Sequence, residues 1–301
     1  MTIKLTCGSK LMAGKTCLVT GATDGIGRAT ALELAHMGAD VAIVGRNQAK
    51  CAATAIDMRE ESGNASVEYL VADLSSQEEV RRLADEFKQR HQTLDVLVNN
   101  AGAIHLSRKN SADGIEMTFA LNHLSYFLLT NLLLDVLSAS APARVVNVAS
   151  SVHMKAKLDL FDVHAPRRYA GLRTYSRSKL CNVLFTYELA RRLEGTGITA
   201  NALHPGLVAS NILKNNGILG RFLNMVLGVK GISAKAGALT SVYAASSPEM
   251  EGVSGKYLDK KQVVRSSTCS YDEAHAAALW ELSASLTGIP ATSPVSSLPV
   301  G

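Results

Sequence analysis

The sequence predicts a single α/β domain built on a doubly wound parallel sheet of about seven strands. Short runs rich in Val, Ile and Leu alternate with longer segments of helical periodicity, as expected of successive strand–helix–strand units. The strand-like runs are almost continuously apolar, which is typical of parallel strands buried on both faces. A length of 301 residues fits one large sheet of this kind.

Strands and helices are predicted in strict alternation along most of the chain. The predicted strands span residues 16–19, 40–44, 66–71, 94–98, 144–149, 199–202 and 256–258. The predicted helices span residues 26–37, 48–61, 78–90, 114–137, 175–193 and 272–285. We expect an N-terminal extension at residues 1–12, the domain at residues 13–288, and a flexible Ser/Pro-rich tail at residues 289–301.

Composition excludes several classes of protein. With 47% hydrophobic and 19% charged residues, the chain is neither disordered nor fibrous nor a disulfide-dense mini-protein. The net charge of +5 is spread along the sequence, whereas nucleic-acid binders usually concentrate basic residues on one face. Five cysteines without a C-x-x-C pair indicate free thiols in a reducing compartment and no metal site.

No segment reads as a signal peptide or membrane anchor. The N-terminus lacks an apolar run. The charge-free stretch at residues 117–134 is interrupted by polar side chains, so a buried helix is expected there. We therefore expect a cytoplasmic protein.

The glycine-rich turn after the first strand is suited to a pyrophosphate. Glycines allow a sharp turn and a close approach of the backbone, and the following helix offers unpaired N–H groups. The turn has G-x-x-x-G-x-G spacing, and the alternative is a tight strand–helix connection without a ligand. The predicted contact residues are Gly21, Thr23, Asp24, Gly25, Ile26 and Gly27.

The end of the second strand favours NADP(H) over NAD(H). An acidic residue there would bind the ribose 2′-hydroxyl of NAD, but the sequence has Arg46 and Asn47. A guanidinium suits a 2′-phosphate, which it can contact through two hydrogen bonds. The alternative is that Arg46 is a solvated loop charge.

Two further loops complete the predicted cofactor cleft. Asp73 follows the third strand, where it can accept a hydrogen bond from an adenine amino group. Asn100, Ala101 and Gly102 follow the fourth strand, at the carboxyl edge where open α/β sheets bind ligands. Taken separately, each of these loops is also consistent with a simple Asx turn.

Tyr175 and Lys179 are the predicted catalytic pair. They stand four residues apart, which places a phenol and an ammonium on one face of a helix. A neighbouring cation stabilises phenolate and lowers the pKa of a tyrosine from its usual value near 10, so the phenol can exchange a proton. Tyr257 and Lys261 have the same spacing, but they begin in a predicted strand, where positions i and i+4 do not stack.

Two more polar residues are placed to take part. Ser150 follows the fifth strand, where its hydroxyl can bond a substrate carbonyl oxygen. Asn122 lies in the fourth predicted helix and can hold a water or orient Lys179. For Asn122 and the adjacent His123, the alternative is a polar pair satisfied inside a buried helix.

Together these residues resemble the short-chain dehydrogenase/reductase family over almost the whole chain. The resemblance implies a Rossmann-like seven-stranded sheet and selects Ser150, three positions after Asn147, rather than Ser151. It implies that Tyr175 donates the proton, that Lys179 lowers the phenol pKa and binds the nicotinamide ribose, that Ser150 polarises the carbonyl, and that Asn122 supports a water-linked proton relay. It also extends the cofactor site, which then includes Leu74, Tyr175, Lys179, Pro205, Gly206 and Val208.

The long stretch between Ser150 and Tyr175 resembles the retinol-dehydrogenase-like branch of this family, and the segments 150–153, 179–182 and 201–206 support that branch. Two departures from the pattern of this branch weaken any inference of the substrate from the resemblance. Ala149 replaces a usual serine, and the hydrophobic anchor of many animal retinol dehydrogenases is absent from the sequence. Residues 207–232 are apolar enough for a substrate lid, with a packed helix pair or a subunit interface as the alternative.

The predicted activity is NADP(H)-dependent hydride transfer between nicotinamide and a lipophilic alcohol or carbonyl substrate, with Tyr175 as general acid/base. One alternative is a nucleotide-sensing protein without catalysis, and another is a reductase of carbon–carbon double bonds on the same scaffold. We expect no nucleic-acid partner and no membrane span. The resemblance implies a homodimer or homotetramer.

Overall fold

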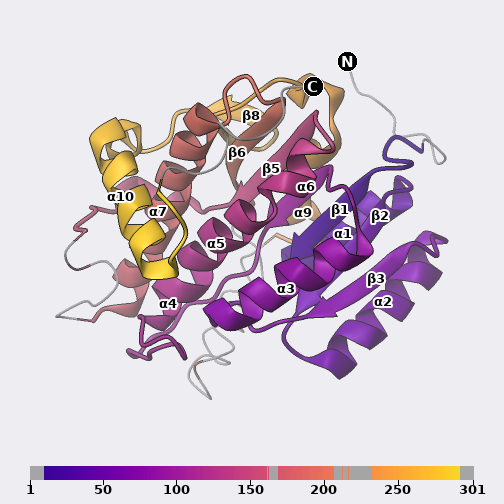
Figure 1. The fold of residues 1–301 in the computed structure, drawn as a ribbon, viewed down its shortest axis with the longest axis horizontal. Coiled ribbons are helices and arrows are strands. Elements are labelled where there is room, and N and C mark those ends of the chain that lie inside the picture. Colours follow the sequence, from indigo (N-terminus) through magenta and orange to yellow (C-terminus); the bar gives the residue numbers. More distant parts are fainter. Residues whose placement is uncertain are drawn as a thin grey trace.

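The computed structural model describes residues 10–160, 162, 169–206, 212, 216 and 232–291. These residues form one eight-stranded sheet in the order β3-β2-β1-β4-β5-β6-β7-β8 (Figure 1). The strands are β1 Thr16–Thr20, β2 Asp40–Gly45, β3 Val67–Val71, β4 Val96–Asn99, β5 Ala143–Val148, β6 Ile198–His204, β7 Lys256–Asp259 and β8 Gln262–Val264. Strands β1 to β7 pair in parallel, which confirms the predicted doubly wound sheet.

The eighth strand was not predicted. It runs antiparallel to β7 after a turn in which Lys260 and Lys261 both have positive φ. Tight hairpin turns of this kind usually carry Asn or Gly at those positions, so two lysines gave no sign of a turn.

Helices cover both faces of the sheet. The helical elements are α1 Gly25–His36, α2 Gln48–Ser62, α3 Gln77–Arg90, α4 Met117–Phe119, η1 Ala120–Leu124, α5 Ser125–Leu132, α6 Leu134–Ser138, η2 Ser151–Lys155, α7 Gly171–Arg192, α9 Ala234–Ser246, η4 Pro248–Met250, η5 Thr268–Tyr271 and α10 Glu273–Thr287. Side chains of α3, α5, α6, α7 and α10 share one apolar core with the sheet, while α1, α2 and α9 share the other (Figure 1). Strands β1, β2, β4, β5 and β6 are therefore mostly buried on both sides, which accounts for their continuous apolar sequence.

The segment predicted as one helix over residues 114–137 is broken. It consists of α4, the π-helical turn η1, α5 and α6, with Leu133 at φ −105° and ψ 8° between the last two. The π turn contains Asn122, and such turns are common at functional sites. The apolar pattern of this buried segment carried no signal for the two interruptions.

Helix α9 was also missed. Its buried face consists of small side chains, among them Gly237, Ala238, Ala244 and Ala245, and it packs on α1. Small residues give a weak helical period of hydrophobicity, so the sequence pattern did not reveal it.

The predicted chain ends need one correction. Ile289 and Ala291, assigned to a flexible tail, pack on the core, and the carbonyl of Ala291 accepts hydrogen bonds from Trp280 Nε1 (3.1 Å) and Arg192 Nη1 (2.8 Å). Residues 292–301, residues 1–9 and most of the predicted lid lie outside the described residues. Within the described ranges, no helix is both long and apolar enough to cross a membrane.

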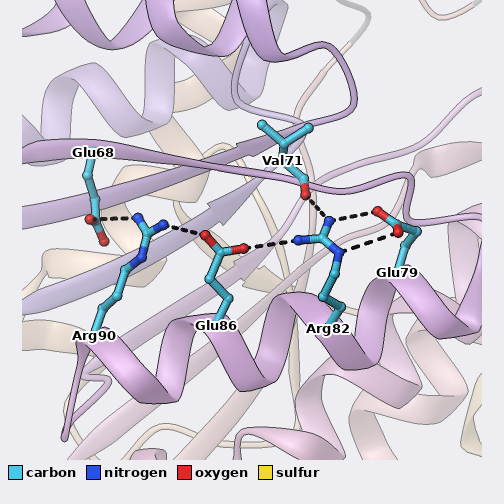
Figure 2. Close-up of polar contacts among 6 residues, drawn as sticks. All are labelled: Glu68, Val71, Glu79, Arg82, Glu86 and Arg90. Atoms are coloured by element: carbon cyan, nitrogen blue, oxygen red, sulfur yellow. Dashed lines mark hydrogen bonds and ion pairs between the residues drawn. The ribbon is translucent and has the colours of Figure 1, made fainter.

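A row of ion pairs joins α3 to the edge strand β3. Figure 2 shows Arg82 between Glu79 and Glu86, with Arg82 also bonded to the carbonyl of Val71. Arg90 continues the row to Glu86 and Glu68. These exposed pairs contribute about 1 kcal/mol or less each, so their main effect is to cover the carbonyl edge of β3.

His123 predicts acid sensitivity of the fold. Its fully buried ring lies between Phe119 and Phe185, bonded to Ser283 Oγ at 2.9 Å, and burial lowers its pKa from 6.5 to about 3. Because the unfolded chain binds this proton more readily, stability should fall by about 1.4 kcal/mol per pH unit as pH drops from 6.5 towards 3. Urea unfolding at several pH values measures this slope.

His123→Leu should make that slope shallower, whereas His36→Leu, at an exposed position where the ring contacts the backbone carbonyl of Glu61, should leave it unchanged. An equally steep slope in His123→Leu would contradict this assignment.

Candidate active site

A cleft of about 600 Å³ lies at the carboxyl ends of β1 to β4. Thirteen predicted cofactor residues line it: Gly21, Thr23, Asp24, Gly25, Ile26, Gly27, Arg46, Asn47, Asp73, Leu74, Asn100, Ala101 and Gly102. Lys50, Ala103, Leu121 and Ile212 line it as well, and these were not predicted. A larger hollow of about 1170 Å³ lies at the opposite, amino edge of the sheet, but it contains none of the predicted site residues.

The turn before α1 leaves room for an anion. Asp24 caps the helix by accepting a hydrogen bond from Gly25 N (2.8 Å), and Gly25 has φ +55°. A Cβ on Gly25 would meet nothing within 4 Å, so open space faces the helix N-terminus. A Cβ on Gly27 would instead collide with Asn100 Nδ2. This cradle fits the pyrophosphate of a dinucleotide.

The end of β2 presents basic side chains to the cleft. Arg46 is exposed there, and Lys50 forms an ion pair with Asp24 at 3.2 Å. Asn47 caps α2 by accepting a hydrogen bond from Lys50 N (2.8 Å). The basic side chains of this edge suit the extra phosphate of NADP(H).

Asp73 and Asn100 line the cleft but also serve local structure. Asp73 Oδ1 accepts hydrogen bonds from Ser75 N (3.0 Å) and Ser75 Oγ (2.7 Å), which closes an Asx turn. Asn100 Nδ2 donates to the carbonyl of Thr20 (2.8 Å), while Thr20 Oγ1 accepts from Asn100 N (2.9 Å). The amide of Asn100 thus fixes the loop after β4 to the end of β1.

Tyr175 and Lys179 lie on one face of α7, as their spacing predicts. Lys179 is buried, and its Nζ donates to the carbonyl of Val148 (2.8 Å) at the end of β5. The same nitrogen lies 5.8 Å from the centroid of the Tyr175 ring and 5.5 Å from that of Tyr126. Lys179 therefore links the helix, the strand end and the phenol.

Ser150 joins this pair. It follows β5, and its hydroxyl lies near enough to the phenol of Tyr175 to lower the pKa of that group. The same Oγ accepts a long hydrogen bond from Val152 N (3.5 Å), which caps the short helix η2. The structure thus places Ser150 near Tyr175 and Lys179, which follow it in the sequence by 25 and 29 positions.

The proton affinities differ from the sequence expectation. Burial raises the pKa of Tyr175 to about 12, and the nearby Ser150 side chain only partly opposes this rise. Burial also lowers the pKa of Lys179 to about 7. The expected lowering of the phenol pKa by Lys179 is not seen, because burial dominates and disfavours the charged form of both groups. At neutral pH, the phenol of Tyr175 is therefore protonated.

Asn122 holds the loop between the cleft and Lys179. Its Oδ1 accepts from Ala103 N (2.9 Å), and its Nδ2 donates to Ala103 O (3.0 Å) and Ser178 Oγ (3.0 Å). A Cβ on Gly102 would lie 3.2 Å from Asn122 Oδ1 and 3.6 Å from Lys179 Nζ, so Gly102 sits between them. Asn122 therefore acts on the loop, and its direct partners are Ala103 and Ser178.

Some predicted cofactor residues lie apart from the cleft lining. Pro205 and Gly206 follow β6 at the same edge of the sheet, where Gly206 has φ +85°. Tyr175 and Lys179 also lie beyond the lining, and Lys179 Nζ lies next to Gly102. Val208 lies outside the described residues.

Several residues of this region were missed by sequence reasoning. Tyr126 lies one helical turn after Asn122 and donates through its OH to the carbonyl of Ala101 (2.9 Å). Asn99 and Asn147 are paired across β4 and β5, and Asn99 Nδ2 donates to Asn147 Oδ1 (2.9 Å). The four-residue spacing of Tyr126 from Asn122, and the asparagine at each strand end, were the available signals.

Comparison with known proteins gives consistent matches. The family model described as short chain dehydrogenase matches residues 15–217. Mouse retinol dehydrogenase 14 is 43% identical over 292 residues, covering 93% of this chain and 87% of that protein. A crystal structure of a putative uncharacterised protein from Mycobacterium paratuberculosis has a TM-score of 0.77 and 34% identity, covering 96% of this chain and all of that one. The RhlG/NADP active-site complex of Pseudomonas aeruginosa has a TM-score of 0.66 and 28% identity, covering 83% of this chain and 96% of that one.

Proposed function

The chain belongs to the short chain dehydrogenase family, and we propose that it is an NADP(H)-dependent oxidoreductase of lipophilic alcohols or carbonyl compounds. Family membership makes it an NAD(P)-dependent enzyme acting on alcohol or carbonyl groups, in the retinol-dehydrogenase-like branch. The preference for NADP(H), the lipophilic substrate and the roles of individual residues are the proposed part.

The proposal is carried by the arrangement of Tyr175 beside the buried Lys179, whose Nζ lies 5.8 Å from the phenol ring, with Ser150 near the same phenol. When bound, the nicotinamide supplies or accepts the hydride. In the reducing direction, Tyr175 donates its phenolic proton to the substrate oxygen, and Ser150 donates a hydrogen bond to the same oxygen. A phenol that is protonated at neutral pH suits the donor role.

Two observations support the cofactor and the substrate class. Arg46 and Lys50 line the cleft where a 2′-phosphate would bind, and the similar RhlG structure is named as an NADP complex. On the substrate side, Tyr175 packs with Ile104 and with the partly buried Leu106 and Ile212, so the surroundings of the phenol are apolar. The mouse relative is named a retinol dehydrogenase, which fits a lipophilic substrate.

The cofactor proposal predicts a change of preference in Arg46→Asp. Loss of a charge-assisted contact to the 2′-phosphate should weaken NADPH binding by about 10- to 100-fold. NADH binding should be unchanged or tighter, since a carboxylate there can accept from the ribose hydroxyls. Fluorescence titration of wild type and variant with both nucleotides measures this, and equal weakening of NADH would contradict a 2′-phosphate contact.

The activity is tested by a panel of lipophilic ketones, aldehydes and alcohols with NADPH and with NADH. Turnover of alcohol or carbonyl compounds that is faster with NADPH is the expected result. Tight NADPH binding without turnover of any compound would favour a nucleotide-binding protein, and reduction of enones at the carbon–carbon bond alone would favour the double-bond reductase. The cytoplasmic location and the homo-oligomer remain predictions from the sequence.

A further inference from the structure

One peptide group beside the proposed active site is held by two histidines. The carbonyl of Ser150 and the N–H of Ser151 belong to the same peptide plane. His153 Nδ1 lies 2.6 Å from the Ser150 carbonyl oxygen, and His204 Nδ1 accepts from Ser151 N at 3.2 Å. The plane is therefore bonded from both sides, by groups from η2 and β6.

These contacts fix the protonation of both rings. A carbonyl can only accept, so His153 carries its proton on Nδ1. Its Nε2 accepts from the backbone N–H of Ser267 (3.2 Å), so that nitrogen holds no proton and the fully buried ring is neutral. His204 accepts at Nδ1, so its single proton lies on Nε2. A second proton on either ring would oppose a backbone N–H.

His153 is in turn held by a loop that is distant in sequence. Ser267 follows β8, and the neighbouring Ser266 Oγ is hydrogen-bonded to Tyr187 OH of α7 (2.7 Å) and to Ser270 Oγ (2.7 Å). The His153 ring also packs on the ring of Tyr257 in β7, at 4.8 Å. The imidazole thus connects the end of β5 to two elements outside the cofactor cleft.

The groups facing the two rings determine their titration. Burial lowers the pKa of His153, and a positive charge on His204 would lower it further. Burial also lowers the pKa of His204, where Asp259 raises it and Lys260 lowers it by smaller amounts. Tyr257 and Tyr187 stay neutral at acid pH, because burial raises the pKa of both phenols.

We propose that His153 and His204 are positioning residues that hold the Ser150–Ser151 peptide plane and thereby keep the Ser150 hydroxyl against Tyr175. Ser150 is extended (φ −164°, ψ 151°), so the orientation of this plane determines where its side chain points. The inference rests on the proposed function, since it assigns Ser150 to the reaction. Neither histidine touches the reacting atoms; both act through the backbone of Ser150.

Paired substitutions separate the two bonds of His153. His153→Leu should lower kcat by about 10- to 100-fold, the cost of a displacement of about 1 Å, with NADPH binding unchanged. His153→Asn places an amide donor at the Nδ1 position and should restore most of kcat, whereas His153→Gln reaches only the Nε2 position and should not.

The same comparison applies to His204. His204→Leu should lower kcat, and His204→Asn, which places an acceptor at the Nδ1 position, should restore it. His275→Leu, at an exposed position, is the matched control.

A double-mutant cycle with Ser150→Ala distinguishes positioning from general support of the fold. If His153 acts through Ser150, then His153→Leu should not lower the residual turnover of Ser150→Ala any further.

The dependence of kcat on pH is an independent measurement of the same positioning role. Because burial lowers the pKa of both rings, wild-type kcat should begin to fall only at a pH below the usual histidine value of 6.5, and the double variant with Asn at both positions should lose this dependence.

Folded His153→Leu and His204→Leu with kcat within about twofold of wild type, alongside a slow Ser150→Ala, would overturn the positioning role and leave the proposed function intact. Wild-type turnover in both Ser150→Ala and Tyr175→Phe would instead overturn the assignment of the site. If His153→Leu does not fold, the His204 variants test the same peptide plane from its other side.

Discussion

Tyr175→Phe is expected to lower kcat by about 10²- to 10⁴-fold, the usual contribution of a positioned general acid. The substitution removes the phenolic proton and keeps the ring in its apolar contacts with Ile104. NADPH binding should be unchanged, because the cleft lining does not include Tyr175. Steady-state kinetics on a substrate from the panel, with a fluorescence titration of NADPH, measure both quantities.

Tyr243→Phe is a suitable control for this variant. Tyr243 lies on α9, which packs on the opposite face of the sheet, and its hydroxyl donates to Glu249 of η4. This variant should keep the wild-type kcat. A Tyr175→Phe enzyme with wild-type turnover would show that the proton reaches the substrate by another route, and equal losses in both variants would indicate a general effect of removing a hydroxyl.

The parts of the predicted site whose positions the structure shares depend on local sequence. The turn around Gly25 connects consecutive elements, and the positions of Tyr175 and Lys179 follow from helical periodicity alone. The parallel order of the strands then brings their carboxyl ends to one edge. Because these strands are neighbours in the sheet, the residues that follow them line one cleft, although each motif taken alone is weak evidence.

The features of the site that the sequence did not predict depend on contacts between segments that are distant in the chain. The pKa of Tyr175 is set by burial, which no spacing of residues reveals. The hydrogen bond from Ser267 to His153 joins residues 114 positions apart. The sequence therefore showed His153 only as part of a family resemblance and did not indicate its structural role. The π turn at Asn122 breaks a charge-free segment whose polar side chains do not mark the position of the interruption.

Lys179→Met is expected to abolish most activity and to stabilise the protein. Burial lowers the pKa of Lys179 from 10.5 to about 7, so folding opposes its charge. At about 1.4 kcal/mol per pKa unit, this cost approaches about 4 kcal/mol at pH 7. Loss of the hydrogen bond to the Val148 carbonyl offsets about 1 kcal/mol of the gain. A methionine of similar length keeps most of the apolar packing.

The sign of the pH dependence tests this explanation. Because the folded-state pKa lies below the unfolded one, the wild type gains stability as pH rises from 7 towards 10.5. The stability advantage of Lys179→Met should therefore be largest at pH 7 and shrink by about 1.4 kcal/mol per unit above it. Urea unfolding of both proteins at pH 7 and pH 9.5 measures the difference, with the exposed-site variant Lys256→Met as control. An advantage that is equal at both pH values would mean that packing, not charge burial, is the cause. A lysine that weakens the fold and yet is required for turnover is retained for its chemistry, since the packing alone would favour an apolar side chain at that position.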